Sequence, residues 1–183
     1  MTIDLFVSCV MDQFYPDTAK NVVKVLNAAD VDVEYNPEQT CCGKFAFNSG
    51  FVDEAKELGE KFLRDFPNDR PIVGVSASCV GYIKKRYEEL FYNTASHLEY
   101  KRLVRNIFEF TDFLVNKINI MNFGAEFNHK VVYQDTCCSL RELGLKDEGR
   151  KLLSNVKGIE ILEMKYPEDT LWFVNVILER DCP

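Results

Sequence analysis

Cysteine is the residue type through which this sequence could carry out metal or redox chemistry. The chain contains seven cysteines, and a long cysteine-free stretch separates them into two groups. The first group is Cys9, Cys41, Cys42 and Cys79, and the second begins at Cys137. In a reducing compartment thiols do not persist as disulfides, so this many cysteines there indicates metal binding or redox catalysis.

The adjacent pair Cys41 and Cys42 indicates which metal group the thiolates would hold. Two neighbouring thiolates cannot easily converge on one small ion without backbone strain, whereas a cluster of several iron atoms offers separate attachment points. Structural zinc usually takes cysteines two or more residues apart. The pair therefore favours an iron–sulfur cluster, with zinc as the alternative. Gly43 either lets the backbone approach a cluster or adopt a positive φ, or is an ordinary turn glycine.

A fold that alternates strands and helices would position these cysteines. Apolar runs predict strands at residues 3–8, 31–35, 71–75, 131–134 and 159–164. Helical spacing of apolar residues predicts helices at residues 16–26, 51–62, 83–90, 98–114 and 145–152, the second of them capped by Asn48 or Ser49. This alternation predicts an α/β fold with a parallel sheet flanked by helices, of the Rossmann-like kind.

The predicted sheet brings the first group of cysteines to one edge. Cys9 follows the first strand, Cys41 and Cys42 lie on the loop after the second, and Cys79 lies a few residues past the third. Ligands of parallel sheets gather where the loops at the carboxyl ends of the strands converge. We therefore expect one pocket to collect all four thiols.

Composition and charge exclude several classes of protein. With 183 residues, 46% hydrophobic and 28% charged, the chain has the composition of an ordinary globular protein. A net charge of -7 argues against a nucleic-acid partner, because phosphate binding needs clustered Lys and Arg. The sequence predicts no transmembrane segment and no basic leader at its N-terminus, and we expect a cytoplasmic protein.

The spacing of Cys9, the Cys41-Cys42-Gly43 motif and Cys79 resembles the CCG cysteine-rich domain family. This family includes the cysteine-rich subunit of heterodisulfide reductase, the iron–sulfur subunit of glycolate oxidase and the L-lactate utilisation protein A group. Residues 46–50, 111–113 and 152–158 resemble the last group, and the likeness spans almost the entire chain.

The resemblance implies that Cys9, Cys41, Cys42 and Cys79 bind an iron–sulfur cluster of the 4Fe–4S type, with Gly43 beside it. It also implies a non-catalytic electron-transfer subunit of an oxidoreductase complex that oxidises L-lactate or a similar 2-hydroxy acid. The partners would be sibling redox subunits of a lactate or glycolate oxidation complex. One departure concerns cluster type, because Ser76 stands where heterodisulfide reductase has a further cysteine.

Members of the family contain two such repeats, which here predicts a complete repeat at residues 1–125 and an incomplete one at 126–183, packed on the same core. Aligning Cys137 with Cys9 makes Cys137 an additional candidate metal ligand and places Asp169 and Thr170 on the cysteine pair. The second CCG motif is thus absent. Two explanations are open: a frameshift from about Leu171 onward, or a natural truncation.

Two other classes of function compete with electron transfer. A cluster facing an open pocket could carry out thiol or disulfide chemistry, as in heterodisulfide reductase. Alternatively, the domain could be a structural zinc-binding or metal-free scaffold. Iron and sulfide content separates the scaffold from the two redox functions.

Overall fold

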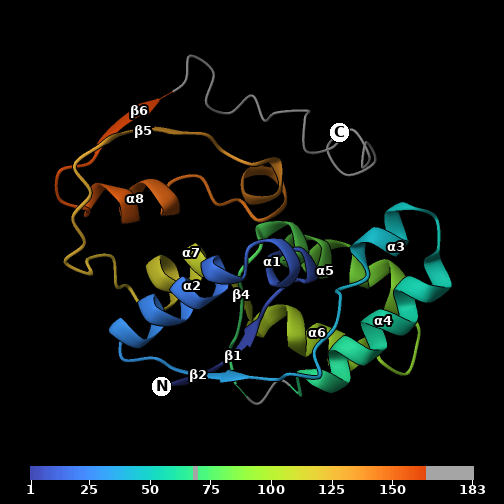
Figure 1. Ribbon diagram of the computed structural model, residues 1–183. Helices are drawn as coiled ribbons and strands as arrows, with labels where there is room; N and C mark the ends of the chain where they lie inside the picture. The colour runs from blue at the N-terminus through green and yellow to red at the C-terminus, as the bar shows by residue number, and fades with distance from the viewer. Residues whose placement is uncertain (68–69, 164–183) are drawn as a thin grey trace. The chain divides into compact units, whose positions relative to one another are not determined.

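The computed structural model describes residues 1–67 and 70–163, and it confirms an α/β fold with a parallel four-stranded sheet flanked by helices (Figure 1). The chain divides into two units, one from Met1 to Phe110 and one that starts at Thr111. The repeat boundaries predicted at residues 1–125 and 126–183 are not tested by this division and stay a prediction.

The first unit is built on a sheet with strand order β2-β1-β3-β4 in which every pairing is parallel. Leu5 pairs with Tyr35 on one side and with Val73 on the other. The inner strands β1 and β3 are buried along almost their whole length, as expected for strands covered on both faces. The strands are β1 (Thr2–Phe6), β2 (Asp32–Tyr35), β3 (Ile72–Gly74) and β4 (Ile107–Glu109).

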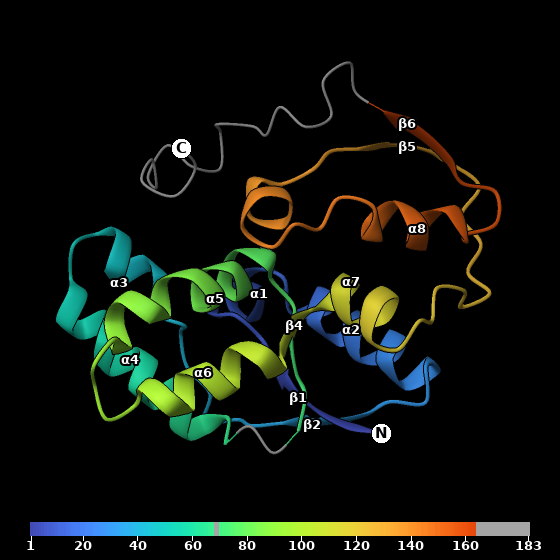
Figure 2. The same ribbon diagram turned by 180° about the vertical axis from the view of Figure 1, so that it is seen from behind.

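Helices cover both faces of this sheet. Helix α2 lies on one face, and α4, α5 and α6 lie on the other (Figures 1 and 2), as right-handed crossovers require when the chain passes from β1 to β2 and then back to β3 and β4. Pro16 begins α2, where its missing N–H costs nothing. The helices are α1 (Cys9–Phe14), α2 (Pro16–Ala28), α3 (Lys44–Asn48), α4 (Val52–Asp65), α5 (Ala77–Phe91) and α6 (His97–Asn106).

Aromatic side chains fix α4 and α5 against the sheet. The ring of Phe62 in α4 meets that of Phe6 in β1 edge to face at 4.8 Å between centroids, and it meets that of Tyr87 in α5 edge to face at 6.1 Å. All three rings are at most 2% exposed. Edge-to-face pairs of this kind stabilise a core beyond the area they bury. The segments that carry the cysteines are therefore attached to a rigid core.

Two of the predicted elements are wrong in their bounds. The helix expected at residues 98–114 ends at Asn106, and Ile107–Glu109 forms strand β4 instead. Ile107 and Glu109 are buried and pair with β3, so pairing in the sheet overrides a helical apolar spacing. The predicted cap of the helix at residues 51–62 is also wrong. Neither Asn48, which is the last residue of α3, nor Ser49 caps α4, because Phe51 is the residue that precedes it.

The second unit contains its own two-stranded parallel sheet. Thr2 of β1 pairs with Asp32, and Lys130 of β5 pairs with Glu160 at the same separation in sequence. Asp169, Thr170 and Leu171 lie outside the described residues. The elements after β4 are α7 (Phe110–Asp112), the π-helical turns η1 (Phe113–Lys117) and η2 (Cys138–Glu142), β5 (Lys130–Tyr133), α8 (Glu148–Ser154) and β6 (Glu160–Glu163).

In residues 1–67 and 70–163, none of the helices combines the length and apolar character that crossing a bilayer requires.

Candidate thiol site

Three neighbouring strands deliver four thiols to one edge of the first sheet. Cys9 is the first residue of α1, immediately beyond β1. Cys41 and Cys42 end the loop after β2, and Gly43 directly precedes α3. Cys79 lies in the first turn of α5, which follows β3. Because β2, β1 and β3 are adjacent in the sheet, their carboxyl ends bring these loops together.

The four sulfur atoms form one connected group. The Sγ atoms of Cys9 and Cys41 are 3.5 Å apart. The Cys42 thiol forms hydrogen bonds with Cys41 and with Cys79. Cys9 is exposed, Cys41 and Cys79 are half-buried, and Cys42 is buried. This group of four thiols therefore extends from the surface into the core.

Hydrogen bonding within this group of thiols makes their pKa values differ. A hydrogen bond from Cys42 lowers the pKa of Cys41 to about 5, and one from Cys42 also lowers the pKa of Cys79. Desolvation raises the pKa of Cys9 to about 11, and the bonds to its two neighbours raise the pKa of Cys42 well above its ordinary value. Without a bound metal, the pKa values of Cys41 and Cys79 thus lie below the ordinary value of a thiol, and those of Cys9 and Cys42 lie above it.

Gly43 allows the cysteine pair to sit against α4. Its φ of 87° is in the left-handed region, which glycine adopts without strain. A Cβ atom at this position would lie 3.0 Å from the carbonyl oxygen of Ala55. The Gly43 N–H donates to Cys41 Sγ over 3.4 Å. The geometry confirms the positive φ predicted for Gly43, whereas an approach of its backbone to a cluster stays a prediction.

Gln39 ties the cysteine-bearing loops together, and sequence reasoning missed it. Its Oε1 accepts from the Val7 N–H at 2.8 Å, while its Nε2 donates to the carbonyl oxygens of Leu5 at 3.2 Å and Asn36 at 3.0 Å. One side chain thus joins the end of β1, which leads to Cys9, to the loop that leads to Cys41. A glutamine between two loops carries no sequence signal that distinguishes it from a surface residue.

Lys44, Ser76 and Tyr87 also make contacts around the thiols, and of these only Ser76 was noted in the sequence. Lys44, only 7% exposed, donates from Nζ to the Ser78 hydroxyl at 3.1 Å. The Ser76 hydroxyl donates to Cys79 and helps to lower its pKa. The Tyr87 hydroxyl donates to the Cys42 carbonyl oxygen at 2.8 Å. The spacing of the cysteines identified the ligand candidates but gave no information about these supporting contacts.

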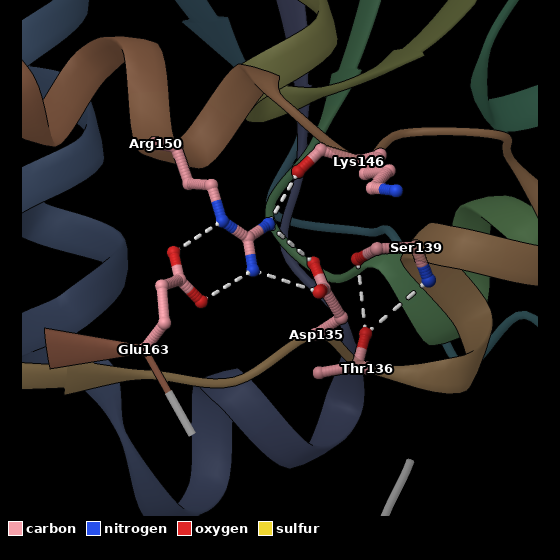
Figure 3. A network of polar contacts seen from close by, with 6 residues as sticks. All are labelled: Asp135, Thr136, Ser139, Lys146, Arg150 and Glu163. Atoms are coloured by element: carbon pink, nitrogen blue, oxygen red, sulfur yellow. Dashed lines mark hydrogen bonds and ion pairs between the residues drawn. The ribbon is translucent and has the colours of Figure 1, made fainter. Parts of the chain in front are cut away.

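The structure places Cys137 in the second unit, where it precedes η2 and is buried together with Cys138. The neighbouring residues form a network around Arg150 (Figure 3). Its guanidinium binds both carboxylate oxygens of Asp135, at 2.8 and 2.9 Å, and both of Glu163, at 2.7 and 3.0 Å. The carboxylates hold the pKa of Arg150 above its ordinary value. These ion pairs of Arg150 connect the segment after β5, just before Cys137, to the end of β6.

In the part of the chain that the structure describes, no group of three or more His, Cys, Asp or Glu side chains is arranged to hold a metal ion.

Comparisons with known proteins point to one family. Residues 3–84 match the cysteine-rich domain called CCG. Lactate utilization protein A 2 of Bacillus cereus strain Q1 is 35% identical over 174 residues, which are 94% of this chain and 72% of that protein. Lactate utilization protein A of Oceanobacillus iheyensis is 36% identical over 174 residues, covering 94% and 71% of the two chains. No solved structure matches.

Proposed function

Because the chain belongs to the lactate utilization protein A family, we propose that it is an iron–sulfur electron-transfer subunit of a complex that oxidises L-lactate or a similar 2-hydroxy acid. The observation that carries the proposal is that the thiols of Cys9, Cys41, Cys42 and Cys79 form one connected group at one edge of the sheet. Four thiols gathered from three loops suit a group that accepts and releases electrons, so the protein acts by carrying electrons.

The chemistry of the donor set suits a polynuclear cluster rather than a single metal ion, for which the described side chains are not arranged. Thiolates are the ordinary ligands of iron–sulfur clusters, and four of them come from three separate loops. Two are already acidic without metal, since the pKa values of Cys41 and Cys79 are lowered. Gly43 presents its backbone N–H to a sulfur atom, as the backbone around iron–sulfur clusters does. A cluster of the 4Fe–4S type is the proposed cofactor.

Each residue has a defined part in the proposal. Cys9, Cys41, Cys42 and Cys79 hold the cluster, which when bound accepts and releases electrons. The Gly43 N–H and the Ser76 hydroxyl donate hydrogen bonds to ligand sulfurs and so stabilise their thiolate forms. Ser76 in this role is a hydrogen-bond donor to Cys79. Cys137, the additional candidate ligand, lies in the second unit, and we do not assign it to this cluster.

The proposal includes the partners and the compartment. An electron carrier of this kind needs sibling redox subunits, one to deliver electrons from the hydroxy acid and one to remove them. The exposed Cys9 marks the side from which a partner would approach. A reducing, cytoplasmic location keeps the thiols available for the cluster.

Metal analysis of anaerobically purified protein tests the proposal. We expect near-stoichiometric iron and sulfide and an EPR signal on reduction, lost in Cys41→Ser and Cys42→Ser. Cys138→Ser is the matched control, since it removes a buried cysteine of the second unit, and it should keep the iron. Zinc in place of iron, or no metal after reconstitution, would overturn the proposal and leave a scaffold role.

The Cys9–Cys41 contact favours a second candidate function, thiol–disulfide exchange. The Cys41 thiolate would attack one sulfur of a substrate disulfide, forming a mixed disulfide and releasing one thiolate. Cys9, after losing its proton, would then attack Cys41 Sγ, forming the Cys9–Cys41 disulfide and releasing the second thiolate. The substrate disulfide is thereby reduced by two electrons and the protein oxidised by two.

Stoichiometric reaction of the reduced, metal-free protein with a small aromatic disulfide measures this activity. The second candidate predicts two thiols released per chain and a Cys9–Cys41 disulfide detectable by mass spectrometry. Cys9→Ser should stop the reaction after one thiol and retain the mixed disulfide. Release of two thiols by Cys9→Ser would show that another cysteine resolves the intermediate and would exclude this mechanism.

A further inference from the structure

Lys44 is a buried lysine next to the thiol site. It is the first residue of α3, follows the Cys41-Cys42-Gly43 motif directly and is only 7% exposed. Lysine is almost never this buried unless its charge is compensated, because removing an ammonium group from water is costly. The burial of Lys44 therefore requires a local reason.

The helix that Lys44 begins does not supply that reason. The N-terminal end of a helix carries a partial positive charge and is stabilised by anions. A lysine at the first position of α3 therefore has the wrong sign for the helix. The surroundings that favour a cation here must come from outside α3.

The thiol site supplies them from two sides. Lys44 is two residues from Cys42 in sequence, and its Nζ donates to the hydroxyl of Ser78, the residue directly before Cys79, at 3.1 Å. The ammonium group thus bridges the loop after β2 and the first turn of α5.

We propose that Lys44 is a positioning residue whose buried ammonium group offsets the negative charge of the ligand thiolates and their cluster, and thereby raises the cluster's reduction potential. The inference rests on the proposed function. Reduction adds one negative charge to the cluster, so a fixed nearby cation stabilises the reduced form more than the oxidised form. The low dielectric of a buried site strengthens this effect, and net charge near a cluster is one of the factors that set its potential.

The experiment is an EPR-monitored redox titration of the reconstituted full chain and four variants. Lys44→Met and Lys44→Gln remove the charge at similar side-chain length, Lys44→Arg keeps it, and Lys24→Met is the matched control on the exposed surface of α2. Iron and sulfide are measured in each sample first. We expect a lower midpoint potential in the two neutral variants, and a midpoint close to that of the unchanged protein in Lys44→Arg and Lys24→Met.

The outcomes separate the two proposals. An unchanged protein that holds no iron and sulfide overturns the proposed function, and this inference with it. If the cluster is present and all Lys44 variants share one midpoint potential, only the inference is overturned. An equal shift in Lys44→Arg and Lys44→Gln also overturns it, because packing rather than charge would then set the potential. Should Lys44→Met fail to fold, the comparison of Lys44→Gln with Lys44→Arg decides.

Discussion

Gly43 determines how closely the vicinal cysteines approach α4. We expect Gly43→Ala to lower the free energy of unfolding by more than the ~1–2 kcal/mol that a left-handed conformation costs an L-residue, because its Cβ also meets the Ala55 carbonyl oxygen at 3.0 Å. Gly50→Ala is the control: Gly50 has a φ of 89° but no atom within 4 Å of the added Cβ. Urea unfolding measures both, and equal losses would show that the contact with Ala55 is unimportant.

The thiols of the metal-free site should differ in their reaction with iodoacetamide. Alkylation requires the thiolate, so Cys41, with its pKa lowered to about 5, should react at pH 7 and lose reactivity only as the pH falls through about 5. Cys9, with its pKa raised to about 11, should react slowly until the pH rises toward that value. Cys42→Ala removes the donor to Cys41 and should raise its pKa.

Mass spectrometry of peptides from a pH series distinguishes the two cysteines within one sample, so each serves as the control for the other. Faster labelling of Cys9 than of Cys41 at pH 7 would contradict the assignment. The ordering is informative because Cys9 is the more exposed of the two. Access alone would favour Cys9, whereas acidity favours Cys41.

Among the elements, the loops after β1 and β2 depend on Gln39. We expect Gln39→Ala to cost about 2 kcal/mol of unfolding free energy, because the buried Val7 N–H loses its acceptor and two carbonyl oxygens lose a donor. Gln13→Ala is the matched control, since the Gln13 side chain is exposed and donates to neighbouring Asp12. Chemical denaturation of the two variants measures their free energies of unfolding. If Gln39→Ala loses no more than Gln13→Ala, the Gln39 hydrogen bonds do not support the site.

In the second unit, Arg150 holds β5 to β6. Arg150→Lys keeps the charge but cannot bind Asp135 and Glu163 with paired hydrogen bonds at the same time. A charge-assisted hydrogen bond contributes about 2 kcal/mol, so we expect the β5 amides to exchange with solvent deuterium roughly tenfold faster or more. Lys157→Met, which breaks an ion pair between exposed side chains, should leave exchange in β5 unchanged. Equal protection in Arg150→Lys would mean that backbone pairing alone holds the strands.

The alternation of strands and helices was predictable, and so was the collection of four cysteines at one sheet edge. The apolar runs and the position of each cysteine after a strand carry that information. Helix α3 and strand β4 were missed for physical reasons. Helix α3 is only one turn long, and the apolar residues of β4 also fit a helical spacing, so only pairing with β3 decides its conformation. Contacts such as that of Lys44 with Ser78 depend on tertiary structure and have no local pattern.

For the molecule as a whole, we infer that the second unit repeats the beginning of the first. Aligning Cys137 with Cys9 also aligns Lys130 with Thr2 and Glu160 with Asp32, and both pairs are partners in parallel strands. The same alignment places Gly158, with a φ of 79°, on Asp30, with a φ of 54°. Agreement in register and in backbone conformation supports a shared strand–helix–strand plan that includes the segment leading to each cysteine.

The inferred repeat carries no cysteine pair at the positions that correspond to Cys41 and Cys42. Cys41 and Cys42 correspond to Asp169 and Thr170 in this alignment, so Cys137 has no vicinal partner pair in its own repeat. A single thiolate cannot replace the several that an iron–sulfur cluster requires. We therefore expect Cys137→Ser to retain the iron and sulfide content of the unchanged protein, while Cys79→Ser, a substitution in the first repeat, loses most of it. Iron and sulfide assays on anaerobically reconstituted samples compare the two directly. A comparable loss in both variants would mean that Cys137 is a ligand after all, and that the two repeats share one cluster.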